Sequence, residues 1–298
     1  MQQLVGKVAV VTGGASGVGR AMGERFGREG MKVVLADVEE SALESTVKEL
    51  QAGGAEVTGV VTDVARFESV RELAAAAFDT YGAVHVLCNN AGVGSGSEGH
   101  LWQYELNDWA WAMGVNVWGV IHGINAFLPR MIEHGEDGHV VNTSSSNGGV
   151  SPLPSTPIYA LTKAAVVTLT ECLSAHLQGA GGKIKASVLF PGPHMLKTGL
   201  WTSWRNRPTE LAKQRPRTTP YPSLDDWEQA MAKAGLEVQY TPVEEVAARV
   251  VQAIRDEQFW ILPEDEATDD RIRQRADSML ERANPGYLAP FILDQAKA

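Results

Sequence analysis

Short runs of apolar, β-branched residues alternate with longer stretches of helical spacing through the first two thirds of the chain. The expected strands are 7–12, 32–37, 55–61, 83–89, 138–144 and 183–190. The expected helices between them include 39–52, 67–80, 116–134 and 157–178. Most of these strands are apolar nearly throughout, which is typical of strands buried on both faces of a parallel sheet. The alternation predicts an α/β fold with a doubly wound parallel β-sheet flanked by helices.

The alternating pattern loosens after Phe190. Residues 191–240 are rich in proline, tryptophan, threonine and charge, and an expected helix over 242–256 and a last strand in "FWILP" follow them. The charged final residues include "RIRQRADSMLER", which has helical character. The sequence has no internal repeat and no low-complexity linker. We therefore expect a single domain over 1–298, with an extended loop at about 194–240 and a C-terminal tail at about 264–298.

Charge and composition limit the possible partners. The net charge is −10 without a compensating basic cluster, which argues against nucleic acid because phosphates need a basic face. A small molecule is therefore the expected partner. No apolar run reaches the roughly 18 residues of a membrane helix and no signal peptide is evident, so we expect a cytoplasmic protein with no membrane partner.

Cysteine and histidine usage points away from disulfides and metals. Cys88 and Cys172 each lie in an apolar run, and we expect both to be buried free thiols. The seven histidines have no metal-ligand spacing, so no catalytic metal is expected.

A glycine-rich turn, "TGGASGVGR" (12–20), connects the first expected strand to a helix. Gly13, Gly17 and Gly19 allow a tight turn and a close backbone approach to a pyrophosphate, whose charge a helix N-terminus favours. Ser16 and Val18 belong to the same expected cofactor site. Because the turn follows a strand and opens a helix, it predicts a Rossmann-type dinucleotide site.

Asp37, at the end of the second expected strand, predicts which dinucleotide binds. Its carboxylate can accept hydrogen bonds from the ribose hydroxyls of the adenosine half and would repel a 2′-phosphate. Ala15 and Val38, the latter also placed in the cofactor site, offer no cation for that phosphate. Glu39 and Glu40 are expected to add to the repulsion. NAD is therefore the expected cofactor, in preference to NADP.

A set of further motifs resembles the short-chain dehydrogenases/reductases, in their single-domain subgroup with a Tyr-x-x-x-Lys pair. The motifs, in family order, are "TGGASGVG" (12–19), "TDV" (62–64), "NNAG" (89–92), Asn116 in "VNVWG", "SNGG" (146–149), "YALTK" (159–163) and "PGP" (191–193). They cover about residues 5–195, with weaker likeness at 240–262. The resemblance implies the same fold and a reaction in which hydride moves to or from a nicotinamide.

Tyr159 and Lys163 are the expected acid/base pair. They are four residues apart in an expected helix and therefore lie on the same face. Tyrosine with its ordinary pKa near 10 is a poor base at neutral pH, but a nearby ammonium and the positive nicotinamide would lower that pKa. The resemblance implies that Tyr159 is the general acid/base and that both residues also contact the cofactor.

The resemblance also assigns one of three consecutive serines to the substrate. The family's substrate-orienting serine precedes the tyrosine by thirteen residues, a count that selects Ser146. Ser144 and Ser145 are expected to bond backbone at the strand end, because strand neighbours point to opposite faces. Asn116 is implied to bend a helix through a water and to link Lys163 to solvent.

The remaining cofactor contacts are also implied by the resemblance. They are Asn90, Ala91 and Gly92 beside the adenosine-side ribose, Asp63 and Val64 at the adenine, and Pro191 with Gly192 beside the nicotinamide. Family members commonly have a threonine about five residues after the proline, bonding the carboxamide. Here Thr198 follows Pro191 by seven residues, so the loop bulges or a backbone group takes its place.

The extended loop carries Trp201, Trp204, Tyr221 and Trp227. Loops at this place cover the substrate in the family, so these aromatic side chains could line a pocket for a bulky or ring-containing alcohol. Equally, they could anchor the loop to a small core of its own. The expected substrate site contains Ser146, Tyr159, His194 and Trp201.

These observations predict an NAD-dependent oxidoreductase that interconverts a secondary alcohol and a ketone. The alternative is a catalytically silent NAD-binding sensor or scaffold, which the complete set Asn116, Ser146, Tyr159 and Lys163 disfavours. Epimerases or dehydratases of the extended branch and enoyl reductases fit the glycine and Tyr–Lys spacings poorly. The resemblance implies a homodimer or homotetramer through 116–134 and 157–178. The substrate, the direction of reaction and the role of the tail stay open.

Overall fold

The computed structural model describes residues 1–94, 100–216, 221 and 223–291. Within this part of the chain, seven parallel strands form one sheet in the order β3-β2-β1-β4-β5-β6-β7. The strands are β1 (Val8–Thr12), β2 (Lys32–Asp37), β3 (Val57–Val61), β4 (Val86–Asn89), β5 (Gly138–Thr143), β6 (Ile184–Leu189) and β7 (Trp260–Ile261). The predicted doubly wound α/β fold is confirmed, and each strand lies within its expected run.

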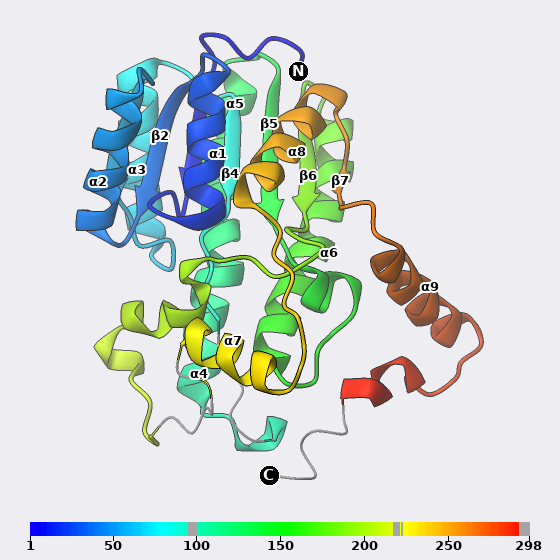
Figure 1. Cartoon of the computed structure of the whole chain (residues 1–298). Helices are drawn as coiled ribbons and strands as arrows, with labels where there is room; N and C mark the ends of the chain where they lie inside the picture. Colours follow the sequence, from blue (N-terminus) through cyan, green and yellow to red (C-terminus); the bar gives the residue numbers. More distant parts are fainter. Residues whose placement is uncertain (95–99, 217–220, 222, 292–298) are drawn as a thin grey trace.

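Helices cover both faces of the sheet (Figure 1). One face carries α1 (Gly17–Arg28), α2 (Glu40–Ala52) and α8 (Val243–Asp256). The other carries α3 (Phe67–Tyr81), α5 (Gly119–Glu133) and α6 (Pro157–Gly179). The apolar strands are therefore buried on both faces, as their composition predicts.

Alternation along β1 divides the core into two layers. Ala9 and Val11 pack with α1 and α8, whereas Val8 and Val10 pack with α3 and α5. The α1 layer is filled by Phe26, which is fully buried. Because successive strand side chains point to opposite faces, one short apolar run supplies both layers.

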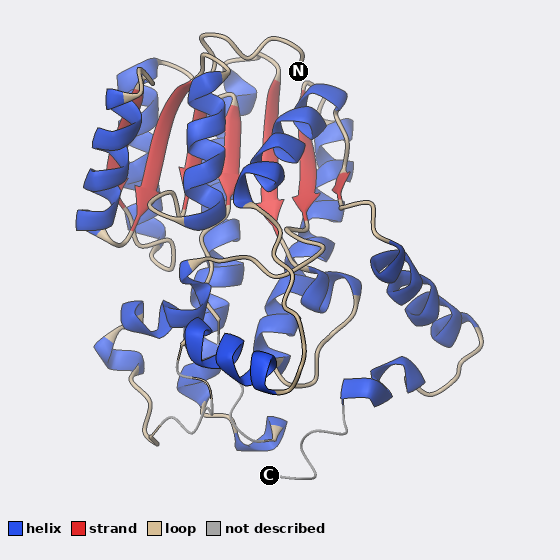
Figure 2. Cartoon of the chain, in the orientation of Figure 1, coloured by secondary structure: helices blue, strands red, loops and turns tan. Residues whose placement is uncertain are grey.

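The strand order reverses between β1 and β4, since β1 is followed along the chain by β2 on one side and is paired with β4 on the other. Open α/β sheets bind ligands at the carboxyl ends of the strands beside such a reversal. In Figure 2 all arrowheads point toward the lower half of the molecule, where α4 and α7 lie. The candidate site is therefore expected between the sheet and these helices.

Two helices in the lower half were not predicted. They are α4 (Leu106–Met113) and α7 (Leu224–Lys233), each of which begins with a capping box: Glu105 with Asp108, and Ser223 with Asp226. The second box was readable in the sequence as Ser-x-x-Asp. The expected helix over 116–134 is instead a π-helical turn, η2 (Gly114–Trp118), continued by α5.

Short turns complete the lower half and the tail. They are η1 (Leu101–Gln103), η3 (Ser146–Val150), η4 (Gly199–Asn206), η5 (Thr209–Leu211) and η6 (Gly286–Phe291). The tail helix α9 (Glu266–Leu280) extends away from the body in Figure 1 and is tied to η3 by the Arg275 side chain, which donates to the Val150 carbonyl at 2.8 Å.

Helix α6 is the one described helix whose length and composition would allow it to cross a membrane. The same helix packs against β5, β6 and η3 and buries Lys163, so its apolar residues already serve the interior of this fold. Cys88 is buried in β4 as predicted, but Cys172 is exposed on α6, because it lies on the opposite side of the helix from the buried Thr170 and Leu173.

We expect Phe26→Ala to lower the free energy of unfolding by about 3–5 kcal/mol, because it leaves a cavity between α1 and the sheet. Urea unfolding followed by circular dichroism measures this change. Arg28→Ala, on the exposed face of the same helix, serves as the control and should cost less than about 0.5 kcal/mol. A loss below about 1 kcal/mol for Phe26→Ala would contradict this packing.

Candidate active site

Tyr159 and Lys163 lie one turn apart near the start of α6. The Lys163 Nζ is 5.6 Å from the centroid of the Tyr159 ring. Lys163 is only 4% exposed, and its Nζ donates a hydrogen bond of 2.8 Å to the Thr143 carbonyl at the end of β5. The helical spacing thus brings the ammonium and the phenol together at the carboxyl edge of the sheet.

Burial perturbs both groups. It lowers the pKa of Lys163 to about 8, because a buried ammonium loses its hydration. It raises the pKa of Tyr159 to about 12, and a hydrogen bond from Ser145 opposes this rise. The phenol is therefore protonated at neutral pH in the chain alone, so its use as a base requires further positive charge beside it.

Ser144 and Ser145 both bond backbone groups, as predicted, and Ser145 also acts on Tyr159. Ser144 is buried and donates to the Lys163 carbonyl at 2.7 Å, as expected for a serine that bonds backbone. Ser145 accepts a bond of 3.2 Å from the Asn147 N–H, and it is the serine whose hydroxyl acts to lower the pKa of Tyr159. Ser146, which the count of thirteen selected, makes no contact of this kind with Tyr159 among the described residues.

The backbone changes conformation between Ser145 and Ser146. Ser145 is still extended, and Ser146 begins the turn η3, in which the Ser151 N–H bonds to the Ser146 carbonyl five residues back. Such a π-type turn contains more residues than an α-helical turn. Gly148, with φ of +101°, completes it in a conformation that favours glycine. Tyr159 follows Ser145 by fourteen residues, one more than the count of thirteen that selected Ser146.

Asn116 lies in the π-helical turn η2, and the predicted irregularity of this helix is present. Its Oδ1 accepts from the Val93 N–H at 2.8 Å, and its Nδ2 donates to the Val93 carbonyl and to Thr162 Oγ1, each at 3.0 Å. A Cβ at Gly92 would lie 3.4 Å from Asn116 Oδ1 and 3.5 Å from Lys163 Nζ. Gly92 therefore separates the two side chains without filling the space between them.

The glycine-rich turn fits a dinucleotide pyrophosphate. A Cβ at Gly19 would lie 2.0 Å from the Gly13 carbonyl oxygen, so the start of α1 approaches the end of β1 only with glycine there. Gly13 has a φ of +66°, which also favours glycine. Ser16 precedes the helix but makes no side-chain cap to any described residue. The first N–H groups of α1, at Gly17 and Val18, are thus free to meet an anion.

Thr198 packs directly on this turn, since a Cβ at Gly17 would lie 3.0 Å from Thr198 Cγ2. The loop after Pro191 therefore brings this threonine to the glycine-rich turn. Its backbone is supported by α8, whose Arg249 donates to the Gly192 carbonyl at 2.5 Å.

Asp37 is partly buried at the end of β2. Its Oδ2 accepts from the Ala15 N–H at 3.0 Å, and its Oδ1 accepts from the Glu39 N–H at 3.1 Å. Burial raises the pKa of Asp37, and these two N–H groups oppose the rise. Val38, between Asp37 and Glu39 in the sequence, is exposed. The carboxylate is thus held at the place where a ribose would meet β2.

Glu39, which was predicted to add to the repulsion, is paired with a cation in the structure. The Arg205 side chain of η4 binds both of its carboxylate oxygens, with Nε at 3.1 Å from Oε2. Asn206 Nδ2 also donates to Oε1 at 2.8 Å. The sequence showed no cation at positions 15 or 38, but the fold brings one to this edge from 166 residues further along the chain.

The "NNAG" segment ties strand ends together. The Asn90 and Ala91 N–H groups both donate to Thr12 Oγ1, at 3.0 and 3.1 Å, and Asn90 Nδ2 donates to the Thr12 carbonyl at 3.1 Å. Asn90 Oδ1 accepts from Thr143 Oγ1 at 3.3 Å. The Asn90 amide therefore joins β1, β4 and β5 at the carboxyl edge of the sheet.

Asp63 and Val64 follow β3 at the same edge. Asp63 Oδ1 accepts from the Ala65 N–H at 3.0 Å, and Val64 packs so closely on α5 that a Cβ at Gly119 would lie 2.9 Å from it. Both residues are thus fixed beside the β2 end.

Trp201 and His194, the two residues of the extended loop that were predicted to contact the substrate, both have structural partners. Trp201 packs on Trp227 with ring centroids 5.5 Å apart, which joins η4 to α7 and fits the anchoring role. His194 is exposed, and its N–H donates to Thr241 Oγ1 at 3.0 Å. Its imidazole lies near the Asp265 carboxylate, whose pKa is lowered chiefly by Thr268 and partly by His194.

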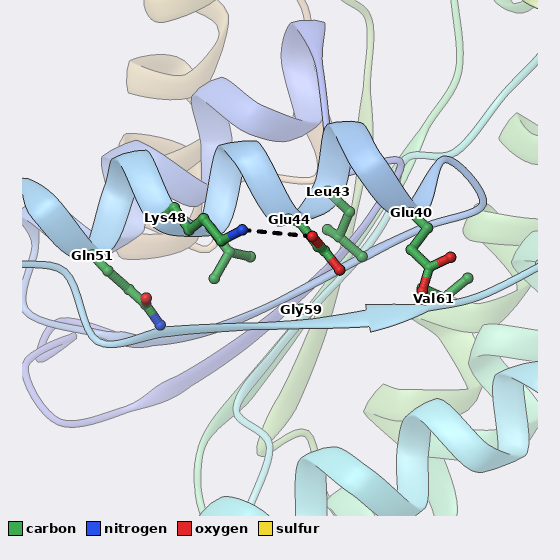
Figure 3. A pocket seen from close by; sticks show the side chains of 8 residues that line it. Glu40, Leu43, Glu44, Lys48, Gln51, Gly59 and Val61 are labelled. Atoms are coloured by element: carbon green, nitrogen blue, oxygen red, sulfur yellow. Dashed lines mark ion pairs between the residues drawn. The ribbon is translucent and has the colours of Figure 1, made fainter.

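A separate groove of about 470 Å³ lies between α2 and β3 (Figure 3). Its walls include Glu40, Leu43 and Gln51, and its charged Glu44 and Lys48 pair with each other at 3.6 Å. It lies along the outer edge of the sheet and, apart from Glu40, contains none of the residues assigned to the site above.

The chain is similar to several known proteins. A family model described as short chain dehydrogenase matches residues 7–208. The 1-deoxy-11-beta-hydroxypentalenate dehydrogenase of Streptomyces exfoliatus is 41% identical over 186 residues, which cover 62% of this chain and 66% of that protein. The chain thus spans about two thirds of that relative's length.

Two solved structures bear on the cofactor. A short chain dehydrogenase/reductase from Burkholderia phymatum in complex with NAD is 42% identical, with a TM-score of 0.86, over 96% of this chain and 98% of that one. A single-substitution variant of the actinorhodin polyketide ketoreductase, with NADPH, is 27% identical, with a TM-score of 0.68, over 85% of this chain and 92% of that one.

Stability should depend on pH through Lys163. Between pH 8 and 10 the unfolded lysine, with a pKa of 10.5, binds more protons than the folded one, so the free energy of unfolding should rise with pH. Relative to Lys163→Met, we expect a gain of about 2 kcal/mol over this range by urea unfolding. Above pH 10 the raised pKa of Tyr159 reverses the trend, so the comparison stops there.

The exposed Lys48 of α2 supplies the control. Lys48→Met should leave the pH dependence of the unfolding free energy parallel to that of the unchanged protein. Parallel curves for Lys163→Met as well would show that Lys163 is not held as a buried ammonium.

Proposed function

The chain belongs to the short-chain dehydrogenase family, and from this premise we propose that it is an NAD-dependent oxidoreductase that interconverts a secondary alcohol and a ketone. The observation that carries the proposal is the meeting of Tyr159, Lys163 and Ser145 at the same edge of the sheet as the glycine-rich turn. We take 1–298 as one domain that contains this whole site.

Each side chain has a distinct role in the proposed reaction. Tyr159 takes the proton of the substrate hydroxyl, and Ser145 holds the same oxygen by a hydrogen bond. The nicotinamide, when bound, accepts the hydride from the carbon that bears this oxygen. The raised pKa of Tyr159 in the chain alone means that the Lys163 ammonium must act together with a further positive charge to favour the phenolate.

Lys163 also begins the route by which the proton leaves. Its ammonium faces the gap beside Gly92, across which lies Asn116 Oδ1. A water in this gap would connect the two side chains, because Asn116 Oδ1 can accept a second bond beside that from the Val93 N–H. We propose that this gap carries the proton relay.

The preference for NAD is supported by the Asp37 carboxylate at the end of β2. A carboxylate there accepts bonds from ribose hydroxyls and repels a 2′-phosphate. The similar Burkholderia protein was solved with NAD, whereas the more distant ketoreductase was solved with NADPH. Because similar folds are found with either cofactor, the proposed preference for NAD rests on the residues at the end of β2, above all Asp37.

We propose a bulky or ring-containing alcohol as the substrate. The insertion from η4 to α7 covers the carboxyl edge of the sheet and supplies aromatic residues there, including the exposed Trp204. The relative from Streptomyces exfoliatus is by its name a dehydrogenase of a hydroxypentalenate, which supports a hydroxyl substrate. His194, at the same edge, is the proposed residue closest to the outer end of the substrate.

We also propose that the protein is a homodimer or homotetramer in the cytoplasm. Trp118 on η2 is 51% exposed and Leu161 on α6 is 46% exposed, so these helices leave apolar side chains for a second copy to cover.

Replacing Tyr159 with phenylalanine should remove the acid/base and lower turnover by about 10²–10⁴-fold. The assay follows nicotinamide absorbance with NAD and a panel of secondary alcohols from small aliphatic to polycyclic. NAD affinity, measured by calorimetry, should stay largely unchanged. Retained turnover would contradict the role of Tyr159. Tight NAD binding by the unchanged protein without turnover of any alcohol would favour the silent sensor.

A comparison of two serine variants tests which hydroxyl holds the substrate. Ser145→Ala should lower kcat by about 10²-fold, since it removes a hydrogen bond to the reacting oxygen. Ser146→Ala, at the next residue, where η3 begins, should keep kcat close to that of the unchanged protein. The reverse result would show that Ser146 holds the substrate oxygen, as the count of thirteen residues predicts, and would reject the role proposed for Ser145.

A further inference from the structure

Arg205 and Glu39 form an ion pair across the edge where the adenosine half of the cofactor is proposed to bind. Arg205 contacts both carboxylate oxygens of Glu39, and Asn206 adds a third bond to the same carboxylate. These bonds, led by that of Arg205, hold the pKa of Glu39 below its usual range. Glu39 is therefore charged at neutral pH and neutralises Arg205.

The Arg205 guanidinium is also held from its other side. Its Nη1 donates to the Gly199 carbonyl at 3.0 Å and to Thr202 Oγ1 at 2.8 Å. These two contacts lie within η4 and do not involve Glu39. They fix the guanidinium so that Nε and Nη2 point at the end of β2, and this fork would keep its direction if the Glu39 charge were removed.

The pair lies beside the residue proposed to receive the ribose. The Glu39 N–H donates to Asp37 Oδ1 at 3.1 Å, and the Glu39 carboxylate is close enough to raise the pKa of Asp37. Arg205, Glu39 and Asp37 thus follow one another along the rim of the adenosine site. A 2′-phosphate on a ribose at Asp37 would meet this rim.

We propose that Glu39 is a second determinant of cofactor choice, which acts by occupying Arg205 and so withholds from a ribose 2′-phosphate a cation positioned to receive it. This inference rests on the proposed function of the site as a cofactor site. Asp37 excludes the phosphate by repulsion, whereas Glu39 excludes it by competing for the guanidinium fork, which binds phosphate and carboxylate oxygens in the same bidentate way.

The test measures binding of half-cofactors to the full chain, so that it does not depend on turnover. Calorimetry gives the Kd of 5′-AMP and of adenosine 2′,5′-bisphosphate, which differ by the 2′-phosphate. Glu39→Gln should raise the affinity for the bisphosphate relative to 5′-AMP by about tenfold, because a charge-assisted bond to Arg205 becomes available. Any general loosening of η4 affects both probes and cancels in the ratio.

Two further variants separate release of Arg205 from the loss of one negative charge. Glu40→Gln removes the neighbouring, exposed carboxylate, which is not paired with Arg205 among the described residues, and should change the ratio little. Glu39→Gln combined with Arg205→Met should abolish the tenfold gain.

The inference is overturned if Glu39→Gln gives no gain, if Glu40→Gln gives an equal gain, or if the double variant keeps the gain. Failure of the unchanged protein to bind either 5′-AMP or NAD would be a different result. It would reject the proposed cofactor site itself.

Discussion

The geometry of the site depends on the hydrogen bond from the buried Lys163 ammonium to the Thr143 carbonyl. Removing an ammonium from water costs several kcal/mol, which the bond to the Thr143 carbonyl offsets only in part, as the lowered pKa shows. The Lys163 carbonyl is bound in turn by Ser144. Both ends of this residue are thus tied to the last residues of β5. The first turns of α6, and with them Tyr159, are thereby fixed relative to the sheet and to Ser145.

The same strand ends are connected sideways by polar side chains. Asn90 bonds to Thr12 at the end of β1 and accepts from Thr143 at the end of β5. A half-buried amide that satisfied only some of these groups would leave the others unpaired at a cost. Asn90 therefore sets the spacing of β1, β4 and β5. A ligand at this edge meets a backbone surface already in place, with the glycine-rich turn on one side and Lys163 on the other.

The strands were predictable because burial on both faces leaves a local pattern, and all of them lie within their expected runs. The turn before α1 was predictable for another local reason, since only glycine at position 19 lets the start of α1 approach the end of β1 so closely. The serine was not, because a residue count cannot detect the wide turn at 146–150. The structure of the extended loop at about 194–240 was harder still to predict. Its attachment depends on the pair between Arg207 and the buried Asp108, 99 residues apart, for which neither residue gives a local signal.

Charge near the cofactor edge shows why local counting fails. Taken in sequence, Asp37, Glu39 and Glu40 present three negative charges and no cation, and each would repel a phosphate equally. In the fold, Asp37 is held by backbone N–H groups, Glu39 is neutralised by Arg205, and only Glu40 is left exposed to solvent. The electrostatic effect of a carboxylate depends on what already pairs with it. Because the insertion supplies the partner of Glu39, it contributes to the chemistry of the adenosine end as well as to the substrate side.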